Sequence, residues 1–182
     1  MTHLIGLIGF KQSGKTTAAE YLESEGFERV NFKDCLIDEL KQNFPDLLNE
    51  IKQNMELRGL PMSIDELFLT KPPLIRTLMQ NYGTDVRRKD NQNYWVNQYA
   101  DKIREMDVNI VSDDVRFLNE AHTIKSNGGS LIRIIREGIT HGGDHISETE
   151  HLKIKEDYTI SVGPGGQEHL YEALDEYLHL IS

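Results

Sequence analysis

Cysteine is almost absent from this chain, which has a single one, Cys35, in 182 residues. One cysteine excludes an intramolecular disulfide and fits a reducing compartment. No motif surrounds Cys35, so we expect a small buried side chain rather than a nucleophile. The first residues also lack the basic region of a secretory signal, and we expect a cytoplasmic protein.

Long apolar runs and positive charge are scarce as well. No stretch approaches the about 20 apolar residues that a membrane-spanning helix needs. The chain has 20 lysines and arginines against 30 acidic residues, a net charge of −10. This balance opposes nonspecific binding to nucleic acid. We therefore expect neither a nucleic-acid nor a membrane partner, and an anionic ligand would need a local cluster of basic residues.

What the sequence does contain is a glycine and lysine pattern at residues 9–17, GFKQSGKTT. Its spacing matches G-x-x-x-x-G-K-S/T, the pattern of loops that surround phosphate. The glycines allow the backbone to turn successive N–H groups inward. The lysine places a charge against the β and γ phosphates, and the threonine hydroxyl suits Mg²⁺. The pattern predicts a site for ATP and Mg²⁺ formed by Gly9, Lys11, Ser13, Gly14, Lys15, Thr16 and Thr17.

The surroundings of this loop support the prediction. Residues 4–9, LIGLIG, have the apolar character of a buried parallel strand, and a helix is expected from Thr17 to about residue 25. The positive end of that helix would face the phosphates. A glycine-rich turn with a chance lysine is the alternative, and the order of strand, loop and helix argues against it.

Strands and helices alternate along the rest of the chain. Further strands are expected at 28–32, 108–114, 130–136 and 157–162, with helices at 34–44, 74–82, 94–106, 117–127 and 167–181. Residues 45–73 show only short helical pieces and read as an insert. The pattern predicts an α/β fold of the P-loop NTPase type, with three layers and a five-stranded, mostly parallel sheet covered by helices on both faces.

Ligands of such sheets bind beyond the carboxyl ends of the strands. The phosphate loop follows an expected strand there, and the pair Asp113 and Asp114 and the residue Arg136 end two further expected strands. A carboxylate at this place suits Mg²⁺, although two acids at a strand end could instead cap the next helix. Neighbouring residues of a strand point to opposite faces, so one aspartate would support the metal, and either could be the one.

Two arginines deserve a chemical explanation. Arg76 lies in an otherwise apolar helix, one turn before Gln80, where its guanidinium could grip a phosphate or could reach solvent. Arg116 lies four residues before Glu120, where a surface ion pair would be the simple interpretation.

Several further motifs resemble the phage-type deoxynucleoside monophosphate kinases. They are LIRTLMQNYGTD at 74–85, NYWV at 93–96, SDDVRFLNEA at 112–121, RIIREG at 133–138 and DHISE at 144–148. The resemblance spans residues 3–160. It implies one kinase domain, residues 1–182, with an acceptor-binding insert at about 34–96 and a lid at about 137–156. The implied reaction converts ATP and a deoxynucleoside monophosphate into ADP and the diphosphate, with Mg²⁺, in the host cytoplasm if a phage encodes the protein.

The resemblance also implies roles for single residues. Arg76 would meet the acceptor phosphate, with Gln80, Gly83 and Thr84 around it, and Trp95 would stack near the acceptor nucleotide unless it is a core residue. Asp114, Arg116 and Glu120 would lie where acceptor and donor meet. Arg136, with His145, Ser147 and Glu148, would belong to the lid, and we interpret His141 and His151 as polar lid residues too. The catalytic set is then Lys15, Asp114, Arg116 and Arg136, and the metal set Thr16, Asp113 and Asp114.

Two positions depart from the family pattern. Lys33 and Ile37 stand where relatives carry a small residue and a lysine, so Lys33 replaces that charge or the acceptor contact differs. Val162 stands where relatives carry an asparagine beside the adenine, which leaves the adenine contact open. Another P-loop kinase, such as a dephospho-coenzyme A kinase, and a nucleotide switch without an acceptor are the alternatives. The base of the acceptor and the oligomeric state, with a homodimer as one option, stay open.

Overall fold

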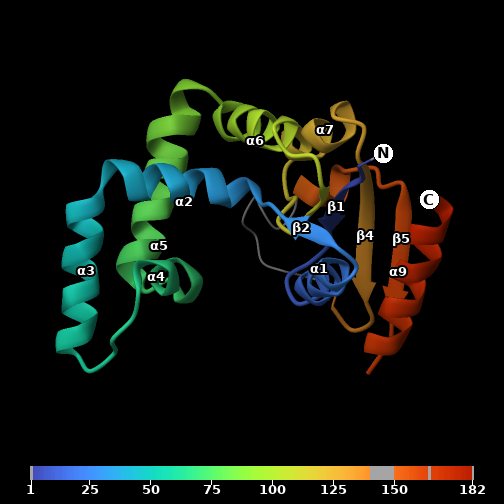
Figure 1. Ribbon diagram of the computed structural model, residues 1–182, viewed down its shortest axis with the longest axis horizontal. Coiled ribbons are helices and arrows are strands. Elements are labelled where there is room, and N and C mark those ends of the chain that lie inside the picture. The colour runs from blue at the N-terminus through green and yellow to red at the C-terminus, as the bar shows by residue number, and fades with distance from the viewer. Residues whose placement is uncertain (1, 140–149, 164, 182) are drawn as a thin grey trace. The chain divides into compact units, whose positions relative to one another are not determined.

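The computed structural model describes residues 2–139, 150–163 and 165–181, with only the backbone at 84 and 85 (Figure 1). The chain forms two compact units. The sheet unit comprises Met1–Phe32 and Tyr99–Ser182, and the helical unit comprises Lys33–Gln98. None of the described helices is long and apolar enough to cross a lipid bilayer.

The sheet unit is built on five parallel strands. They are β1 (Leu4–Ile8), β2 (Phe27–Arg29), β3 (Asn109–Ser112), β4 (Ser130–Arg136) and β5 (Tyr158–Val162). Their order across the sheet is β2-β3-β1-β4-β5, with β1 at the centre (Figure 1). Every neighbouring pair is parallel, so the predicted fold class is confirmed and the sheet is parallel throughout.

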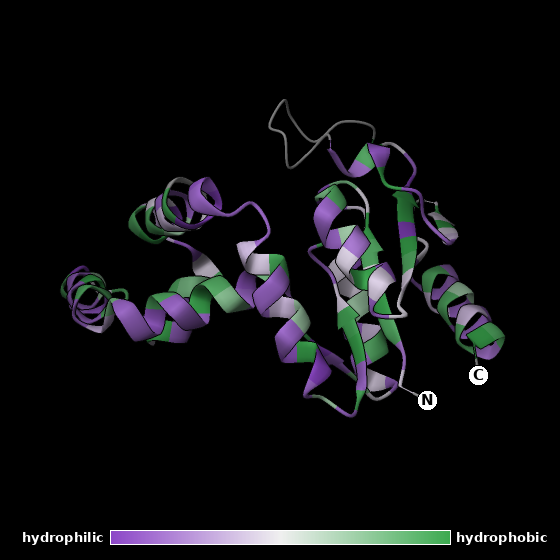
Figure 2. Ribbon diagram, turned by 90° about the horizontal axis from the view of Figure 1, so that it is seen from above, coloured by the Kyte–Doolittle hydropathy of each residue, from purple (hydrophilic) through white to green (hydrophobic). Residues whose placement is uncertain are grey.

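Successive residues of β1 face opposite sides of the sheet, and each side is covered by helices. Ile5 and Leu7 pack with α1 (Lys15–Ser24) and α9 (Gln167–Ile181) in the main core. Gly6 points the other way, where a side chain would touch Ile124 of α7 (Leu118–Ser126). Because both faces are buried, the strands read as continuous apolar runs, and Figure 2 shows their mainly hydrophobic colour.

The ends of the strands differ from the prediction by a few residues. Of the predicted ranges, 130–136 and 167–181 match β4 and α9. The strand expected at 108–114 ends at Ser112, so Asp113 and Asp114 follow the strand rather than close it. The segment expected at 28–32 is a strand only over Phe27–Arg29, because α2 (Phe32–Asn43) begins there.

The helical unit contains most of α2, then α3 (Pro45–Leu57), α4 (Ile64–Thr70), α5 (Pro73–Gln80), a π-helix η1 (Asn81–Arg88) and the start of α6 (Tyr94–Arg104). The expectation of only short helical pieces at 45–73 was wrong for α3. Leu48 and Ile51 recur at helical spacing on α3 and are buried in a core shared with Leu40, Leu67 and Ile75. The helical unit therefore has its own hydrophobic core.

The π-helix η1 was not predicted. Residues 83–93 lie between the helices expected at 74–82 and 94–106. In the structure α5 passes into η1 without a break, because Gln80 and Asn81 both keep helical backbone angles. Such wide turns are rare and have no hydrophobic period that a sequence pattern would reveal. The segment that carries Gly83 and Thr84 is therefore helical rather than extended.

Candidate active site

The phosphate loop leaves the carboxyl end of β1, and its glycines are required by its backbone. Gly9 has φ +148°, and a side chain there would lie 2.4 Å from the carbonyl oxygen of Ile134. Gly14 has φ +107° and forms the N-cap of α1. Few residues other than glycine adopt these angles without strain. The loop therefore has the conformation for which its sequence pattern is known.

Lys15 and Ser13 occupy the inside of this loop. The ammonium of Lys15 donates hydrogen bonds to the carbonyl oxygens of Gly9, at 2.8 Å, and Phe10, at 2.7 Å. The Ser13 hydroxyl is buried and has no hydrogen-bond partner among the described residues. Among the residues that the structure describes, no side chain caps the N-terminus of α1, which begins at Lys15. A phosphate chain would meet the N–H groups of a helix start and a lysine ammonium there, so these residues fit a nucleotide.

The two aspartates after β3 have different surroundings. Asp113 is buried, and one of its carboxylate oxygens lies 3.7 Å from a guanidinium nitrogen of Arg29. Asp114 is half-buried and accepts a hydrogen bond from the backbone N–H of Phe32 at 3.1 Å. Neither aspartate caps α7 in these contacts, and Asp114 is the more open of the two.

A cage made only of protein groups is absent from the described ranges, where no three histidine, cysteine, aspartate or glutamate side chains group together for a metal ion. Mg²⁺ in kinases commonly needs one or two protein oxygens, with water and phosphate oxygens completing its shell. The exposed Thr16 hydroxyl, at the start of α1, and an aspartate beyond β3 are groups of that kind.

Glu120 has a structural contact that the sequence did not reveal. Glu120 is only 3% exposed, so the surface setting of the simple interpretation is wrong. Its carboxylate accepts hydrogen bonds from the backbone N–H groups of Arg116, at 2.8 Å, and Phe117, at 3.1 Å. Glu120 therefore caps the start of α7 and sets the backbone of Arg116, whose side chain is exposed.

Arg136 is exposed and ends β4, while Val162 ends the neighbouring β5 and is buried in the main core. The side chain of a buried valine offers no polar atom to a base, so no adenine contact is assigned to it. Four residues of the predicted lid, His141, His145, Ser147 and Glu148, lie outside the described residues. His151 does not fit the interpretation as a polar lid residue, because it is buried at 2% exposure.

The acceptor residues predicted on α5 share one side of that helix. Arg76 and Gln80 lie one turn apart and are both exposed, whereas Ile75 is buried. Lys33, in the first turn of α2, is half-buried. Thr84 belongs to η1, and its side chain lies outside the described part of the structure. Arg76 is thus accessible to a ligand from the surface of the helical unit.

Trp95 and Gly83 are buried neighbours. The indole of Trp95 is 3% exposed and donates a hydrogen bond to the carbonyl oxygen of Gly83 at 3.0 Å. A side chain at position 83 would come within 3.1 Å of Leu36. Trp95 therefore supports the backbone of η1 from inside the helical unit. Because the indole is buried, it offers no exposed face on which a nucleotide could stack.

Glu39, on α2, connects α2 with η1 and α6, and the sequence did not indicate this role. One of its carboxylate oxygens accepts hydrogen bonds from Tyr82, at 2.6 Å, and from Arg87, at 2.7 Å. The other accepts from Tyr94 at 2.9 Å. The guanidinium of Arg87 lies over the rings of both tyrosines. The members of this network are far apart in the sequence, so no local pattern contains them all. Only Tyr94 belongs to a motif noted in the sequence, NYWV.

The network changes the protonation of Glu39. Burial acts to raise the pKa of this carboxyl, but hydrogen bonds from Tyr82, Tyr94 and Arg87 outweigh burial and lower the pKa below its ordinary value of 4.5. The same contact raises the pKa of Arg87. Burial, followed by the bond to Glu39, raises the pKa of Tyr94. At neutral pH the carboxylate is ionised, and it holds α2, η1 and α6 together.

Replacing Glu39 with glutamine should lower the free energy of unfolding at pH 7 by about 1–2 kcal/mol, because the hydrogen bonds lose their charge. The loss is limited because solvent screens this partly exposed site. A lowered folded-state pKa stabilises the protein above the unfolded-state pKa, and that stability is lost as pH falls through the folded-state value. The difference from the wild type should therefore shrink below pH 4.5. Urea unfolding at several pH values measures it, with the exposed Glu56→Gln as control. A difference independent of pH would contradict the assignment.

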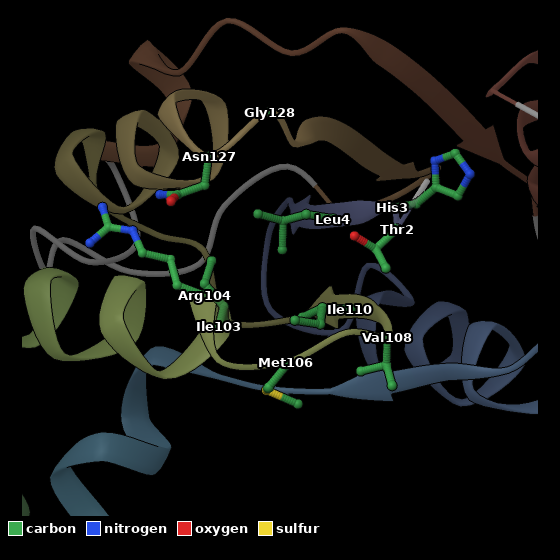
Figure 3. Close-up of a pocket in the computed structure, with 10 residues that line it drawn as sticks. All are labelled: Thr2, His3, Leu4, Ile103, Arg104, Met106, Val108, Ile110, Asn127 and Gly128. Atoms are coloured by element: carbon green, nitrogen blue, oxygen red, sulfur yellow. The ribbon is translucent and has the colours of Figure 1, made fainter.

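The sheet unit also has a hollow away from the phosphate loop (Figure 3). Leu4 and Ile110, at the amino-terminal ends of β1 and β3, line its floor. Arg104 of α6 and Asn127, after α7, lie at its side (Figure 3). The phosphate loop and Asp114 follow the opposite ends of their strands, and Arg136 is the last residue of β4, so this hollow is not part of the candidate active site.

Comparison with known proteins agrees on one family. The family model described as deoxynucleotide monophosphate kinase matches residues 65–174. A protein of Acanthamoeba polyphaga mimivirus, provisionally named a deoxynucleotide monophosphate kinase, is 37% identical over 166 residues, which are 84% of this chain and 83% of the relative. The deoxynucleotide monophosphate kinase of Escherichia phage RB69 is 33% identical over 110 residues, 57% of this chain and 44% of the phage enzyme.

A solved structure supports the fold independently. The crystal structure of TT1252 from Thermus thermophilus matches with a TM-score of 0.52 at 16% identity, covering 100% of this chain and 98% of that one. At this identity the likeness concerns the fold alone, and it agrees with the parallel five-stranded sheet.

Proposed function

The chain belongs to the deoxynucleotide monophosphate kinase family and is a nucleotide-binding P-loop kinase, and we propose that it transfers the γ-phosphoryl group of ATP to a deoxynucleoside 5′-monophosphate. The observation that carries the proposal is the phosphate loop at the end of β1. Its glycine backbone, the Lys15 ammonium over the loop and the start of α1, which no described side chain caps, form a site for the phosphates of the donor.

On the donor side, the loop backbone with Lys11, Ser13 and Thr17 would surround the α and β phosphates. Lys15 would leave the carbonyl oxygens of Gly9 and Phe10 and contact the β and γ phosphates. The Thr16 hydroxyl and one of the two carboxylates, of Asp113 or Asp114, would hold Mg²⁺, which neutralises charge on the phosphates when bound.

On the acceptor side, the monophosphate would bind the exposed face of α5. Arg76 can present two parallel N–H groups to phosphate oxygens, and Gln80 lies beside it on the same face. Gly83 and Thr84 would contribute through η1, which Trp95 and Glu39 hold in place from within the helical unit. Lys33 would supply a further positive charge for the acceptor.

In the transfer step, an oxygen of the acceptor phosphate bonds to the γ phosphorus while the bond from that phosphorus to the β–γ bridging oxygen breaks. ADP leaves with the electron pair, and no protein group needs to take a proton from the fully ionised acceptor. Arg116, oriented by the Glu120 cap, and Arg136 would neutralise the charge of the group in flight. Asp114 would align the metal or the acceptor, and the segment 137–156 would exclude water.

Transfer to dephospho-coenzyme A, or nucleotide binding without transfer, is not favoured by the family match, which includes the Arg76 and Arg116 segments. A coupled assay of ADP release tests the proposal with ATP, Mg²⁺ and each common ribonucleoside and deoxynucleoside monophosphate in turn, and with dephospho-coenzyme A. We expect release that depends on a deoxynucleoside monophosphate and stops when a chelator removes Mg²⁺. Release that is the same with every acceptor and with none would overturn the proposal.

A further inference from the structure

The short 3-10 helix η2, Glu150–Lys153, contacts the phosphate loop through one buried side chain. The ring of His151 meets the ring of Phe10 edge to face, with 4.9 Å between the ring centroids and an angle of 85°. Phe10 is the second residue of the phosphate loop. Its carbonyl oxygen accepts hydrogen bonds from the Lys15 ammonium, at 2.7 Å, and from the N–H of Ser13, at 3.2 Å. The place of the Phe10 backbone therefore affects the loop and its lysine.

The same short helix also contacts the segment that carries Arg116. A carboxylate oxygen of Glu150 accepts a hydrogen bond from the backbone N–H of Leu118 at 3.0 Å. Leu118 is the first residue of α7, two positions after Arg116, and Glu120 caps the two preceding N–H groups. Glu150 thus completes the cap that orients Arg116.

A half-buried arginine of β4 fixes η2 to the sheet. The guanidinium of Arg133 donates hydrogen bonds to the carbonyl oxygens of His151, at 3.1 Å, and Ile154, at 2.7 Å, and forms an ion pair with Glu156 at 2.9 Å. Arg133 is in register with Ile8, the last residue of β1 before the phosphate loop. Two of these bonds go to backbone atoms, so they survive replacement of the His151 side chain.

We propose that η2 is a bridge between the two halves of the donor site, with His151 and Glu150 as positioning residues. His151 would set the phosphate loop through Phe10, and Glu150 would set Arg116 through the start of α7. The inference deepens the proposed function and rests on it for the roles of the loop and of Arg116. It predicts separate effects, on ATP affinity for His151 and on turnover for Glu150.

The first test replaces His151 with leucine and with phenylalanine. His151→Leu should weaken ATP binding, measured by titration calorimetry without acceptor, by about three- to tenfold, the range expected for an aromatic pair. His151→Phe should restore the affinity because it keeps a ring against Phe10. Phe10→Leu should lose as much, and the double variant with His151→Leu should lose no more than either single variant. Additive losses, or equal losses with leucine and phenylalanine, would overturn the role of His151.

The second test concerns Glu150. Glu150→Ala should lower kcat by about three- to tenfold with an unchanged affinity for ATP. Glu150→Gln should recover part of the loss, because its amide oxygen still accepts from Leu118. The exposed residues His122 and Glu172, replaced by leucine and alanine, serve as matched controls. A loss of ATP affinity equal to the loss of kcat would contradict the separate role of Glu150.

A measurement on the protein without nucleotide separates the bridge from the proposed function. Amide hydrogen exchange at Ser13 should be faster in His151→Leu, and exchange at Leu118 should be faster in Glu150→Ala, each without a change at the other amide. Unchanged exchange at both amides would refute the bridge even in an active kinase. If the wild-type protein has no kinase activity but the two variants still show the faster exchange, the bridge is retained and the proposed function is rejected.

Discussion

Replacing Lys15 with alanine should lower kcat by at least about a hundredfold, the cost of losing a charge that acts on the transferring group. The Lys15 ammonium already lies over the loop, within 2.8 Å of two carbonyl oxygens that a phosphate oxygen can replace as partner. Titration of ATP and coupled ADP release measure binding and turnover separately. We expect the loss in turnover to exceed the loss in affinity, because the charge on the γ phosphate oxygens grows as the group leaves.

The exposed Lys52 of α3 provides a matched control, since Lys52→Ala removes the same charge far from the loop in sequence. Lys15→Arg should remain impaired because the longer planar group does not fit the space of a compact ammonium. Thermal unfolding of each variant establishes that the fold persists. Normal turnover in Lys15→Ala would remove the phosphate loop from the mechanism.

Replacing Arg76 with alanine should lower kcat/KM for the monophosphate by about a hundredfold, because a bidentate, charge-assisted contact to the acceptor is lost. The KM for ATP should stay the same, since the donor loop belongs to the other unit of the chain. Arg76 is exposed and Ile75 holds α5 in the core, so the substitution should leave stability nearly unchanged. Initial rates over a matrix of donor and acceptor concentrations separate the two constants.

Arg76→Lys should recover only part of the activity, because lysine cannot offer two parallel N–H groups. Arg58→Ala, an exposed arginine after α3, is the control for net charge in the same unit. An unchanged acceptor KM and kcat in Arg76→Ala would refute the acceptor assignment while leaving the donor site intact.

Predictions from local patterns succeeded where the chain itself dictates conformation. At Gly9 and Gly14 the loop needs backbone angles that glycine adopts, so the glycine spacing indicates the loop before any contact is known. The strands of a parallel sheet are buried on both faces, and their apolar runs therefore stand out in the sequence. The fold class followed from these two kinds of signal.

Predictions about single polar side chains were harder. A surface ion pair was the simple interpretation of Glu120 and Arg116, and His151 was interpreted as a polar residue of the lid. The structure instead buries Glu120 against backbone N–H groups at the start of α7, and it buries His151 against the ring of Phe10. The role of Glu39 was not predicted because its hydrogen-bond partners lie 43 to 55 residues away in the sequence. Whether a polar side chain faces solvent or a neighbour depends on packing between distant segments.

The sequence by itself determined the phosphate loop, the parallel α/β sheet and the family to which the chain belongs, because these depend on glycine geometry, hydrophobic periodicity and the order of motifs. Only the tertiary structure decided that Trp95 supports Gly83 from inside, that Glu120 and Glu150 cap the start of α7, and that His151 packs on Phe10. Each of these contacts joins residues whose side chains are compatible with several environments, and the folded backbone selects one.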